Sequence, residues 1–442
     1  MNFKRQIIWI LGLLLAACAG ALQSDLGGDF TPSAPPPARA TEITLEAPTA
    51  APTLAASPGP LESVQAEPSA TLLPEETAPR GATREFTTDF RVHAVPYTEI
   101  LSGGPPKDGI PAIDNPRYVS VTEADRWLEP VEPVILVQVG EHTRAYPLQI
   151  LTWHEIVNDT LGGLPLTVTF CPLCNTGIAF ERTVDGRVLD FGTTGRLRFS
   201  NLIMYDRQTE TWWQQADGRA IVGALTGARL NFYPAQIIAW QAFKDRSPEG
   251  SVLSRVTGFN RPYGQNPYPG YDDVNRPPFL YKGPTTPGEL LPMERVLTVD
   301  MGAEAAAYPY KVLSEIFVVN DTLGGVEMVV FWSSGTASAL DALTVSGGRD
   351  VGSAAAFRRR LGDRVLEFRS ADGQRRAGER RAGERRAGEF VDRQTGSAWN
   401  SLGQAVSGPL KGTQLEPLVS IDHFWFSWAA FRPDTRIFTP FE

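Results

Sequence analysis

Cysteine, histidine and basic charge are all scarce in this chain. Its 442 residues contain three cysteines and four histidines, and the net charge is −9. A zinc ribbon needs two cysteine pairs, so a closed zinc site of that kind is excluded. No basic stripe is present to displace counterions from phosphate, which argues against nucleic-acid binding. The chain also lacks a phosphate loop, a dinucleotide fingerprint and a Gly-x-Ser-x-Gly elbow, so the familiar nucleotide and hydrolase classes have no support.

The start of the chain predicts export. Lys4 and Arg5 precede an apolar run over 7–17, which is too short to span a bilayer as a stable helix. The run ends Leu-Ala-Ala-Cys at 15–18 and resembles a bacterial lipobox. The resemblance implies that residues 1–18 are a lipoprotein signal peptide and that Cys18 carries the lipid; an ordinary signal peptide is the alternative. We therefore expect an extracytoplasmic lipoprotein anchored to the membrane through Cys18, with its protein partners left open.

Composition divides the rest of the chain. Residues 19–85 are rich in Pro, Ala and Thr and poor in aromatics, which predicts a disordered stalk. Overall, 42% of the residues are apolar and 10% are aromatic, as in a globular protein with a sizeable core. We expect a first lobe over 86–257, a Tyr- and Pro-rich interlobe loop over 258–288 and a second lobe over 289–442.

An internal repeat supports the two lobes. Ala-Tyr-Pro at 145–147 and Val-Asn-Asp-Thr-Leu-Gly-Gly at 157–163 return at 307–309 and 319–325, so the offset is 162 in both blocks (145 to 307, 163 to 325). Asp-Arg-Gln-Thr at 206–209 returns at 392–395, and Trp240 is matched to Trp428. Three blocks in the same order predict a duplication, with each lobe ending in an aromatic helix.

The local patterns predict mostly strands. Residues 134–139 and 142–146 flank Gly-Glu and predict a hairpin, 147–158 predict a short helix with Pro in its first turn, and 164–170 alternate like a strand. The strand runs into the cysteine segment without a clear βαβ pattern around it. The fold class is therefore a β-rich α+β protein of two duplicated lobes that is not thioredoxin-like.

The segment Cys171-Pro-Leu-Cys174 holds the candidate reactive residues, and its spacing is compatible with three hypotheses. In the first, Cys171 and Cys174 bind a soft metal with His154 as third ligand, and Met204, His142 or Asp206 completes the set. Copper is then preferred and zinc is second. In the second, the cysteines cycle between dithiol and disulfide. In the third, they form a structural disulfide that stabilises the fold by only roughly 2 kcal/mol.

The second lobe serves as an internal control. The offset of 162 places Ile316 at the position of His154, Ser333 at that of Cys171 and Thr336 at that of Cys174. The second lobe therefore lacks the reactive groups, and we expect the first lobe to carry the site. The loop over 258–288 is either an ordered connector or the cover of a ligand cleft, and the latter would make the protein a ligand-binding module with a structural cysteine pair.

Five runs together resemble one family, the prokaryotic domain-of-unknown-function-3179 family, over roughly residues 90–440. They are Trp-His-Glu-Ile-Val-Asn-Asp at 153–159, Thr-Phe-Cys-Pro-Leu-Cys at 169–174, Leu-Ile-Met-Tyr-Asp-Arg-Gln-Thr-Glu at 202–210, Thr-Ala-Ser-Ala-Leu-Asp at 336–341 and Asp-His-Phe-Trp-Phe at 422–426. The resemblance implies the fold and the exported setting. It also implies that His154, Cys171, Cys174, Asp206 and Trp213 matter, the last two in support. It assigns no activity, so catalytic residues and enzyme status stay open.

Overall fold

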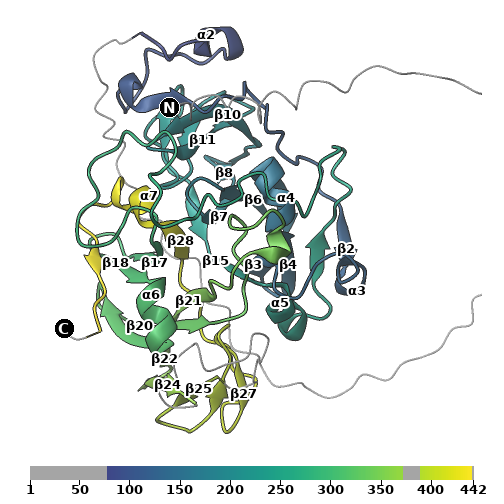
Figure 1. The fold of residues 1–442 in the computed structure, drawn as a ribbon, viewed down its shortest axis with the longest axis vertical. Helices are drawn as coiled ribbons and strands as arrows, with labels where there is room; N and C mark the ends of the chain where they lie inside the picture. Colours follow the sequence, from purple (N-terminus) through teal and green to yellow (C-terminus); the bar gives the residue numbers. More distant parts are fainter. Residues whose placement is uncertain (1–76, 372–388, 441–442) are drawn as a thin grey trace, which may run out of the picture. The chain divides into compact units, whose positions relative to one another are not determined.

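In the part of the chain that the structure describes, short and mostly antiparallel strands outnumber the helices, which are few and short (Figure 1). The computed structural model describes residues 77–371 and 389–440. The predicted signal peptide and nearly all of the predicted stalk lie outside these residues. The fold is a β-rich α+β fold, as the sequence predicts.

The first half begins with the predicted hairpin of β3 (Pro133–Val139) and β4 (His142–Pro147), which pair from Val134 with Pro147 to Val139 with His142. Three further strands complete this sheet in the order β15-β3-β4-β16-β2: β15 (Ala235–Ala239), β16 (Ser251–Leu253) and β2 (Tyr118–Ser120). The strand β16 runs parallel to β4, and the other pairs are antiparallel. Val134, Ile135 and Val137 are fully buried, so the apolar run 134–137 forms a sheet interior rather than a surface.

The helix predicted over 147–158 is shorter than expected. The helix α4 spans Leu148–His154, with Pro147 as its N-cap. Glu155 follows with a positive φ of 58°, which ends the helix. The chain then continues as strand β5 (Ile156–Leu161), so the prediction of helix up to residue 158 is wrong. The apolar residues Ile156 and Val157 face a sheet core and not a helix face.

The strand β5 belongs to a sheet with the order β14-β7-β6-β5. Its other members are β6 (Leu164–Cys171), β7 (Thr176–Glu181) and β14 (Asn231–Tyr233). The strand predicted over 164–170 is thus confirmed, and it ends on the first cysteine. A third sheet has the order β1-β10-β11-β12-β13: β1 (Ile100–Ser102), β10 (Phe191–Arg198), β11 (Asn201–Asp206), β12 (Trp212–Gln214) and β13 (Ala220–Val222). The short pair β8 (Thr183–Val184) and β9 (Arg187–Val188) forms a hairpin.

The second half uses the same order of elements. Hairpin β17 (Arg295–Asp300) and β18 (Ala305–Pro309) is followed by helix α6 (Tyr310–Ile316) and strands β19 (Val318–Leu323) and β20 (Val326–Ser333). The sheets are β28-β17-β18-β29, β19-β20-β21, β22-β23 and β24-β25-β26-β27. Their remaining strands are β21 (Ser353–Arg358), β22 (Arg360–Leu361), β23 (Arg364–Val365), β24 (Phe368–Ser370), β25 (Phe390–Asp392), β26 (Ala398–Trp399), β27 (Ala405–Ser407), β28 (Ser420–Phe424) and β29 (Arg436–Ile437). Origin by duplication stays a prediction.

The helices that end each half correct one detail of the repeat. Helix α5 (Trp240–Arg246) follows β15, and helix α7 (Trp425–Ala429) follows β28. The Trp240 N–H donates to the Glu132 carbonyl and the Trp425 N–H to the Glu294 carbonyl, both at 2.8 Å. The structural counterpart of Trp240 is therefore Trp425, not Trp428. The remaining helices are α2 (Ala82–Glu85), α3 (Val121–Ala124) and the 3₁₀ turns η1 (Tyr97–Glu99) and η2 (Val345–Gly347).

The two halves share a hydrophobic core. Strand β28, yellow in Figure 1, packs against the teal strands β7 and β15. One core cluster joins first-half residues such as Phe170 and Cys174 to Leu340, Phe424 and Phe426. Side chains from the second half therefore border the cysteine segment.

Candidate functional site

The two cysteines lie in the tight turn between β6 and β7. Cys171 ends β6 and pairs with Thr176 at the start of β7. The Cys174 N–H donates to the Cys171 carbonyl at 3.1 Å, and Asn175 closes the turn with φ 54°. Both cysteines are free thiols, with 2% of Cys171 and none of Cys174 exposed. The Cys-x-x-Cys segment thus links two antiparallel strands and does not begin a helix.

The thiol of Cys174 sits among fixed polar groups. Its Sγ donates to the Ser200 carbonyl at 3.5 Å and accepts from Asn201 Nδ2 at 3.4 Å. The Asn201 amide is held in turn by Gln214 Nε2 at 2.6 Å and by Gln215 Oε1 at 2.8 Å. An N–H aimed at sulfur stabilises negative charge that develops there. Asn201 is therefore placed to favour Cys174 as an attacking or leaving sulfur.

Glu155 is the acidic group of the site. It follows helix α4, and its carbonyl accepts from the Phe170 N–H at 2.8 Å, next to Cys171. The residue is buried, and this burial raises the pKa of its carboxyl to about 8. Its charge raises the pKa of Cys171, so the two groups lie near each other. Glu155 can hold a proton at neutral pH and can accept one from a thiol as the pH rises.

The environment of Cys171 keeps its thiol protonated at neutral pH. Burial raises the pKa of Cys171 well above its ordinary value, and the hydrogen bond with the Cys174 side chain and the charges of Cys174 and Glu155 raise it further. The two thiols therefore lie close to each other in the turn while both are reduced. A thiol of this kind is inert until a base removes its proton.

Three tyrosines of the loop over 258–288 lie around this site. The Tyr271 hydroxyl donates to the Leu173 carbonyl at 3.0 Å, inside the cysteine turn. Tyr268 is close enough to Glu155 and Cys171 that burial, followed by their charges, raises the pKa of its phenol. Tyr263 bonds His154. The loop therefore packs over the cysteine site besides connecting the two halves.

His154 does not join the cysteines. Its Nδ1 donates to the Pro111 carbonyl at 2.7 Å, and its Nε2 accepts from the Tyr263 hydroxyl at 2.6 Å. Burial lowers the pKa of His154 to about 4, so the ring is neutral at pH 7. Within 77–371 and 389–440, no three His, Cys, Asp or Glu side chains are grouped closely enough to hold a metal. The three-ligand set predicted from the sequence is therefore not assembled, because both ring nitrogens of His154 are engaged, one by Pro111 and the other by Tyr263 of the loop.

The other predicted residues belong to the scaffold. Met204 is buried within β11, where it pairs with Trp213 on β12. Asp206 Oδ2 accepts from Trp213 Nε1 at 2.9 Å, and Asp392 Oδ2 accepts from Trp399 Nε1 at the same distance in the second half. His142 is exposed at the start of β4. The Asp–Trp pair fixes the same turn in both halves and so is not specific to the cysteine site.

One residue near the site, His423, is not among the site residues predicted from the sequence. His423 on β28 lies with Nδ1 3.2 Å from Thr176 Oγ1, and Thr176 Oγ1 donates to the Cys174 carbonyl at 3.1 Å. The Phe424 N–H donates to that same carbonyl at 2.8 Å. Burial lowers the pKa of His423 to about 3, so it is neutral. No sequence pattern predicts this contact, because it joins positions 247 residues apart.

Glu155 was also left unassigned, although the sequence carried a signal for it. The offset of 162 places Phe317 at its position, and Phe317 has φ 63° against 58° for Glu155. The backbone is thus the same in both halves, while the carboxyl occurs only beside the cysteines. The same internal comparison that singled out His154 would have found Glu155.

Two predictions concern the membrane. Cys18, the predicted lipidation site, lies outside the described residues. Among the residues that are described, no helix is long and apolar enough to cross a membrane.

Comparison with known proteins gives a family and no activity. No curated protein and no solved structure matches the chain. The family model described as "Protein of unknown function (DUF3179)" matches residues 107–435, which include both cysteines, Glu155 and His423. The chain therefore belongs to the DUF3179 family.

Proposed function

We propose that the protein is a thiol–disulfide redox protein whose centre is the Cys171–Cys174 pair. The observation that carries the proposal is the placement of two free, buried thiols at the two ends of one tight turn, near the buried carboxyl of Glu155. A turn of four residues lets the two sulfurs bond without moving either strand. A purely structural disulfide would need neither the buried acid nor the cover of tyrosines.

In the proposed reaction the pair reduces a substrate disulfide. Glu155 accepts the proton of Cys171, and the thiolate attacks one substrate sulfur. The substrate S–S bond breaks, and the released thiolate takes the proton from Glu155. The Cys174 sulfur then attacks Cys171, the mixed disulfide breaks, and the second substrate thiolate leaves with the proton of Cys174. Two electrons pass to the substrate, and a Cys171–Cys174 disulfide remains.

A second candidate is a copper-binding protein in which the two sulfurs alone hold copper(I). Thiolate is a soft ligand that selects this ion, and the site is buried among apolar side chains. Zinc is less favoured, because it prefers four ligands and His154 is engaged elsewhere. The redox reading is preferred, since Glu155 has a role in moving protons and none in a two-sulfur copper site.

The proposed setting is outside the cytoplasm, on a lipid anchor at Cys18. A dithiol that cycles to a disulfide fits such a compartment, because disulfides persist there. We also propose that the second half is a copy of the first that lacks the reactive groups. This copy supports the site through β28.

The test is a redox titration of the full-length protein beside a Cys171→Ser/Cys174→Ser double variant. The protein is purified anaerobically, its copper and zinc are measured, and its free thiols are counted across glutathione buffers of increasing potential. We expect two thiols that disappear together and return on reduction, in the wild type only. Cys18 is present in both proteins, so it contributes equally to the two thiol counts.

One copper ion bound per wild-type molecule and lost in the double variant would contradict the redox proposal and support the copper-binding candidate. A pair that neither oxidises reversibly nor binds metal would overturn both. A further experiment measures how the rate at which the cysteine pair reduces a disulfide depends on pH. It should rise through about pH 8 as Glu155 ionises.

A further inference from the structure

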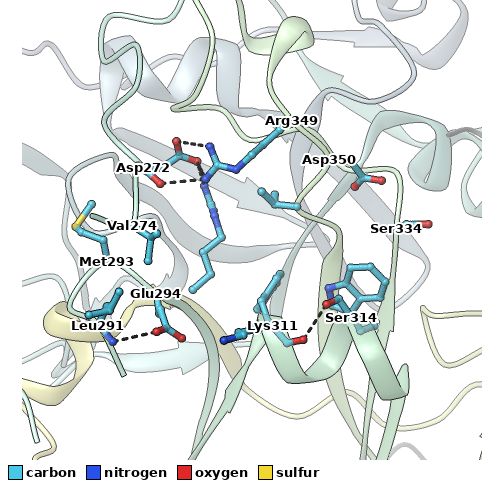
Figure 2. A pocket seen from close by; sticks show the side chains of 14 residues that line it. Asp272, Val274, Leu291, Met293, Glu294, Lys311, Ser314, Ser334, Arg349 and Asp350 are labelled. Atoms are coloured by element: carbon cyan, nitrogen blue, oxygen red, sulfur yellow. Dashed lines mark hydrogen bonds and ion pairs between the residues drawn. The ribbon is translucent and has the colours of Figure 1, made fainter. Parts of the chain in front are cut away.

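A second site lies in the other half of the protein. A cavity of about 640 Å³ is formed by the start of α6, the start of β17, the end of β20 and part of the loop over 258–288 (Figure 2). Apolar walls come from Trp332, Met293 and Val351, and the apolar side chains of Val274 and Leu291 are partly exposed beside them. The volume is in the range of small-molecule sites.

Most charges in this cavity already have partners. Asp272 Oδ2 accepts from Arg295 at 2.7 Å and is 2.9 Å from Arg349. These contacts are drawn in Figure 2. The Asp350 carboxylate accepts from the N–H groups of Gly335 and Gly352 at 2.8 and 2.9 Å. These residues build the walls and leave little capacity for a ligand.

Lys311 and Glu294 differ from the rest. Glu294 accepts only the Leu291 N–H, at 3.1 Å on Oε1, and Lys311 has no carboxylate within ion-pair distance in the described part of the chain. Both side chains extend into the cavity in Figure 2, with the ammonium directed toward the carboxylate. A basic and an acidic group therefore border the same space without forming a pair.

The first half has a pair of residues at the positions that correspond to Lys311 and Glu294, and there the two side chains are bonded. Gln149 is the second residue of α4 as Lys311 is of α6, and Glu132 precedes β3 as Glu294 precedes β17. Gln149 Nε2 donates to Glu132 Oε2 at 2.7 Å, and Arg255 Nε donates to Gln149 Oε1 at 2.9 Å. The Arg255 guanidinium also lies 4.6 Å from the centre of the Trp127 ring. In the first half, the chain's own cation therefore bonds Gln149, and Gln149 in turn bonds the acid.

We propose that the second-half cavity binds a free α-amino acid with an apolar side chain. Its ammonium group pairs with Glu294, the counterpart of Glu132, which the first half satisfies through Gln149. Its carboxylate pairs with Lys311, which stands where the first half has neutral Gln149. Its side chain packs against Trp332, Met293 and Val351. The proposal is independent of the redox chemistry, because it uses none of the residues of the cysteine site.

The test uses three probes with one apolar body. L-Leucine, 4-methylpentanoate without the ammonium and 3-methylbutylamine without the carboxylate are titrated calorimetrically into the full-length protein, with L-phenylalanine as a second amino acid. We expect leucine to bind at least about tenfold more tightly than either analogue, because each analogue lacks one of the two charged hydrogen bonds that leucine makes with Glu294 and Lys311. No binding of either amino acid at about 10 mM, or equal affinity for an analogue, would overturn the proposal.

The variants assign the two charges. Lys311→Gln, which installs the residue of the first half, should reduce leucine to the affinity of the amine, and Glu294→Gln, which keeps the acceptor for Leu291, should reduce it to that of the acid. Lys411→Gln, an exposed lysine outside the cavity, removes the same charge as Lys311→Gln and should have no effect. Unchanged affinity in either cavity variant contradicts the proposal. The Cys171→Ser/Cys174→Ser variant should bind leucine normally, whatever the outcome of the redox titration.

Discussion

At the scale of single residues, the two halves separate what belongs to the scaffold from what belongs to the site. A positive φ is costly for a residue with a side chain, yet both Glu155 and Phe317 adopt it. The backbone after α4 and α6 is therefore a property of the fold. The carboxyl of Glu155 is not, because the second half places an aromatic ring there. The Asp206–Trp213 pair, in contrast, belongs to the scaffold, since Asp392 and Trp399 form the same hydrogen bond in the second half.

Glu155→Gln tests the buried acid through stability. Burial raises the pKa of Glu155 from 4.5 to about 8, so between pH 5 and pH 8 the folded chain keeps a proton that the unfolded chain has lost. Unfolding then releases a proton, and the free energy of unfolding falls as the pH rises. We expect wild type to lose roughly 2–4 kcal/mol relative to Glu155→Gln between these values, measured by urea denaturation.

The control for this comparison is Glu141→Gln, which changes an exposed glutamate in the β3–β4 turn. It should follow the wild-type pH profile. Parallel profiles for wild type and Glu155→Gln would show that the carboxyl of Glu155 titrates normally, and the proton-transfer role proposed for it would then fail.

At the scale of elements, the loop over 258–288 connects the halves and also closes the site. Its backbone is fixed to the second half, where the Asn266 N–H donates to the Leu343 carbonyl at 2.9 Å and the Tyr271 N–H to the Leu340 carbonyl at 3.1 Å. Its tyrosines reach the first half at His154 and Leu173. Because both thiols are buried beneath it, reaction with any substrate larger than a few atoms requires this loop to open.

Tyr263→Phe tests the loop as a cover. The hydroxyl of Tyr263 donates to His154 Nε2 at 2.6 Å and also bonds Thr257 Oγ1 at 2.5 Å. Its loss leaves a buried ring nitrogen unpaired, which costs about 1–3 kcal/mol in the closed state. We expect the rate at which iodoacetamide alkylates Cys171 to rise roughly five- to a hundredfold, provided that loop opening limits access.

Tyr281→Phe in the same loop is the matched control, because its hydroxyl donates locally to the Pro284 carbonyl at 2.6 Å. It should leave the rate within about twofold of wild type, since the bond it removes is exposed. Equal rates for all three proteins would show that this anchor does not control access to the thiols.

At the scale of the whole molecule, the sequence predicted what is encoded locally. The hairpin at 133–147, strand β6 and the contrast between the two halves follow from alternation, Gly turns and repeated blocks. The length of α4 could not be predicted, because the strand pairing of Ile156 overrides a helical pattern that fits the same residues. The set His154, Cys171, Cys174 failed for a related reason. Its members are near in sequence, but the ring of His154 turns toward the loop.

The contacts that the sequence could not show are those that cross between the halves. His423 contacts Thr176, and the Phe424 N–H donates to the Cys174 carbonyl. Each joins positions far apart in the chain, where no periodicity or spacing carries information. The boundaries predicted for the two lobes, 86–257 and 289–442, stay a prediction, and the shared core argues that neither lobe folds alone.

This shared core predicts that the halves unfold together. Removing β28 would expose the Cys174 carbonyl and the apolar side chains that Phe424 and Phe426 cover, so neither half keeps its core without the other. We expect hydrogen exchange under increasing urea to give the same midpoint for β6 and β7 in the first half as for β20 and β21 in the second. A truncation ending at residue 288 should fail to protect β6. Two midpoints separated by more than about 1 M urea, or a protected β6 in the truncated chain, would instead establish the lobes as independent domains that merely lie against each other.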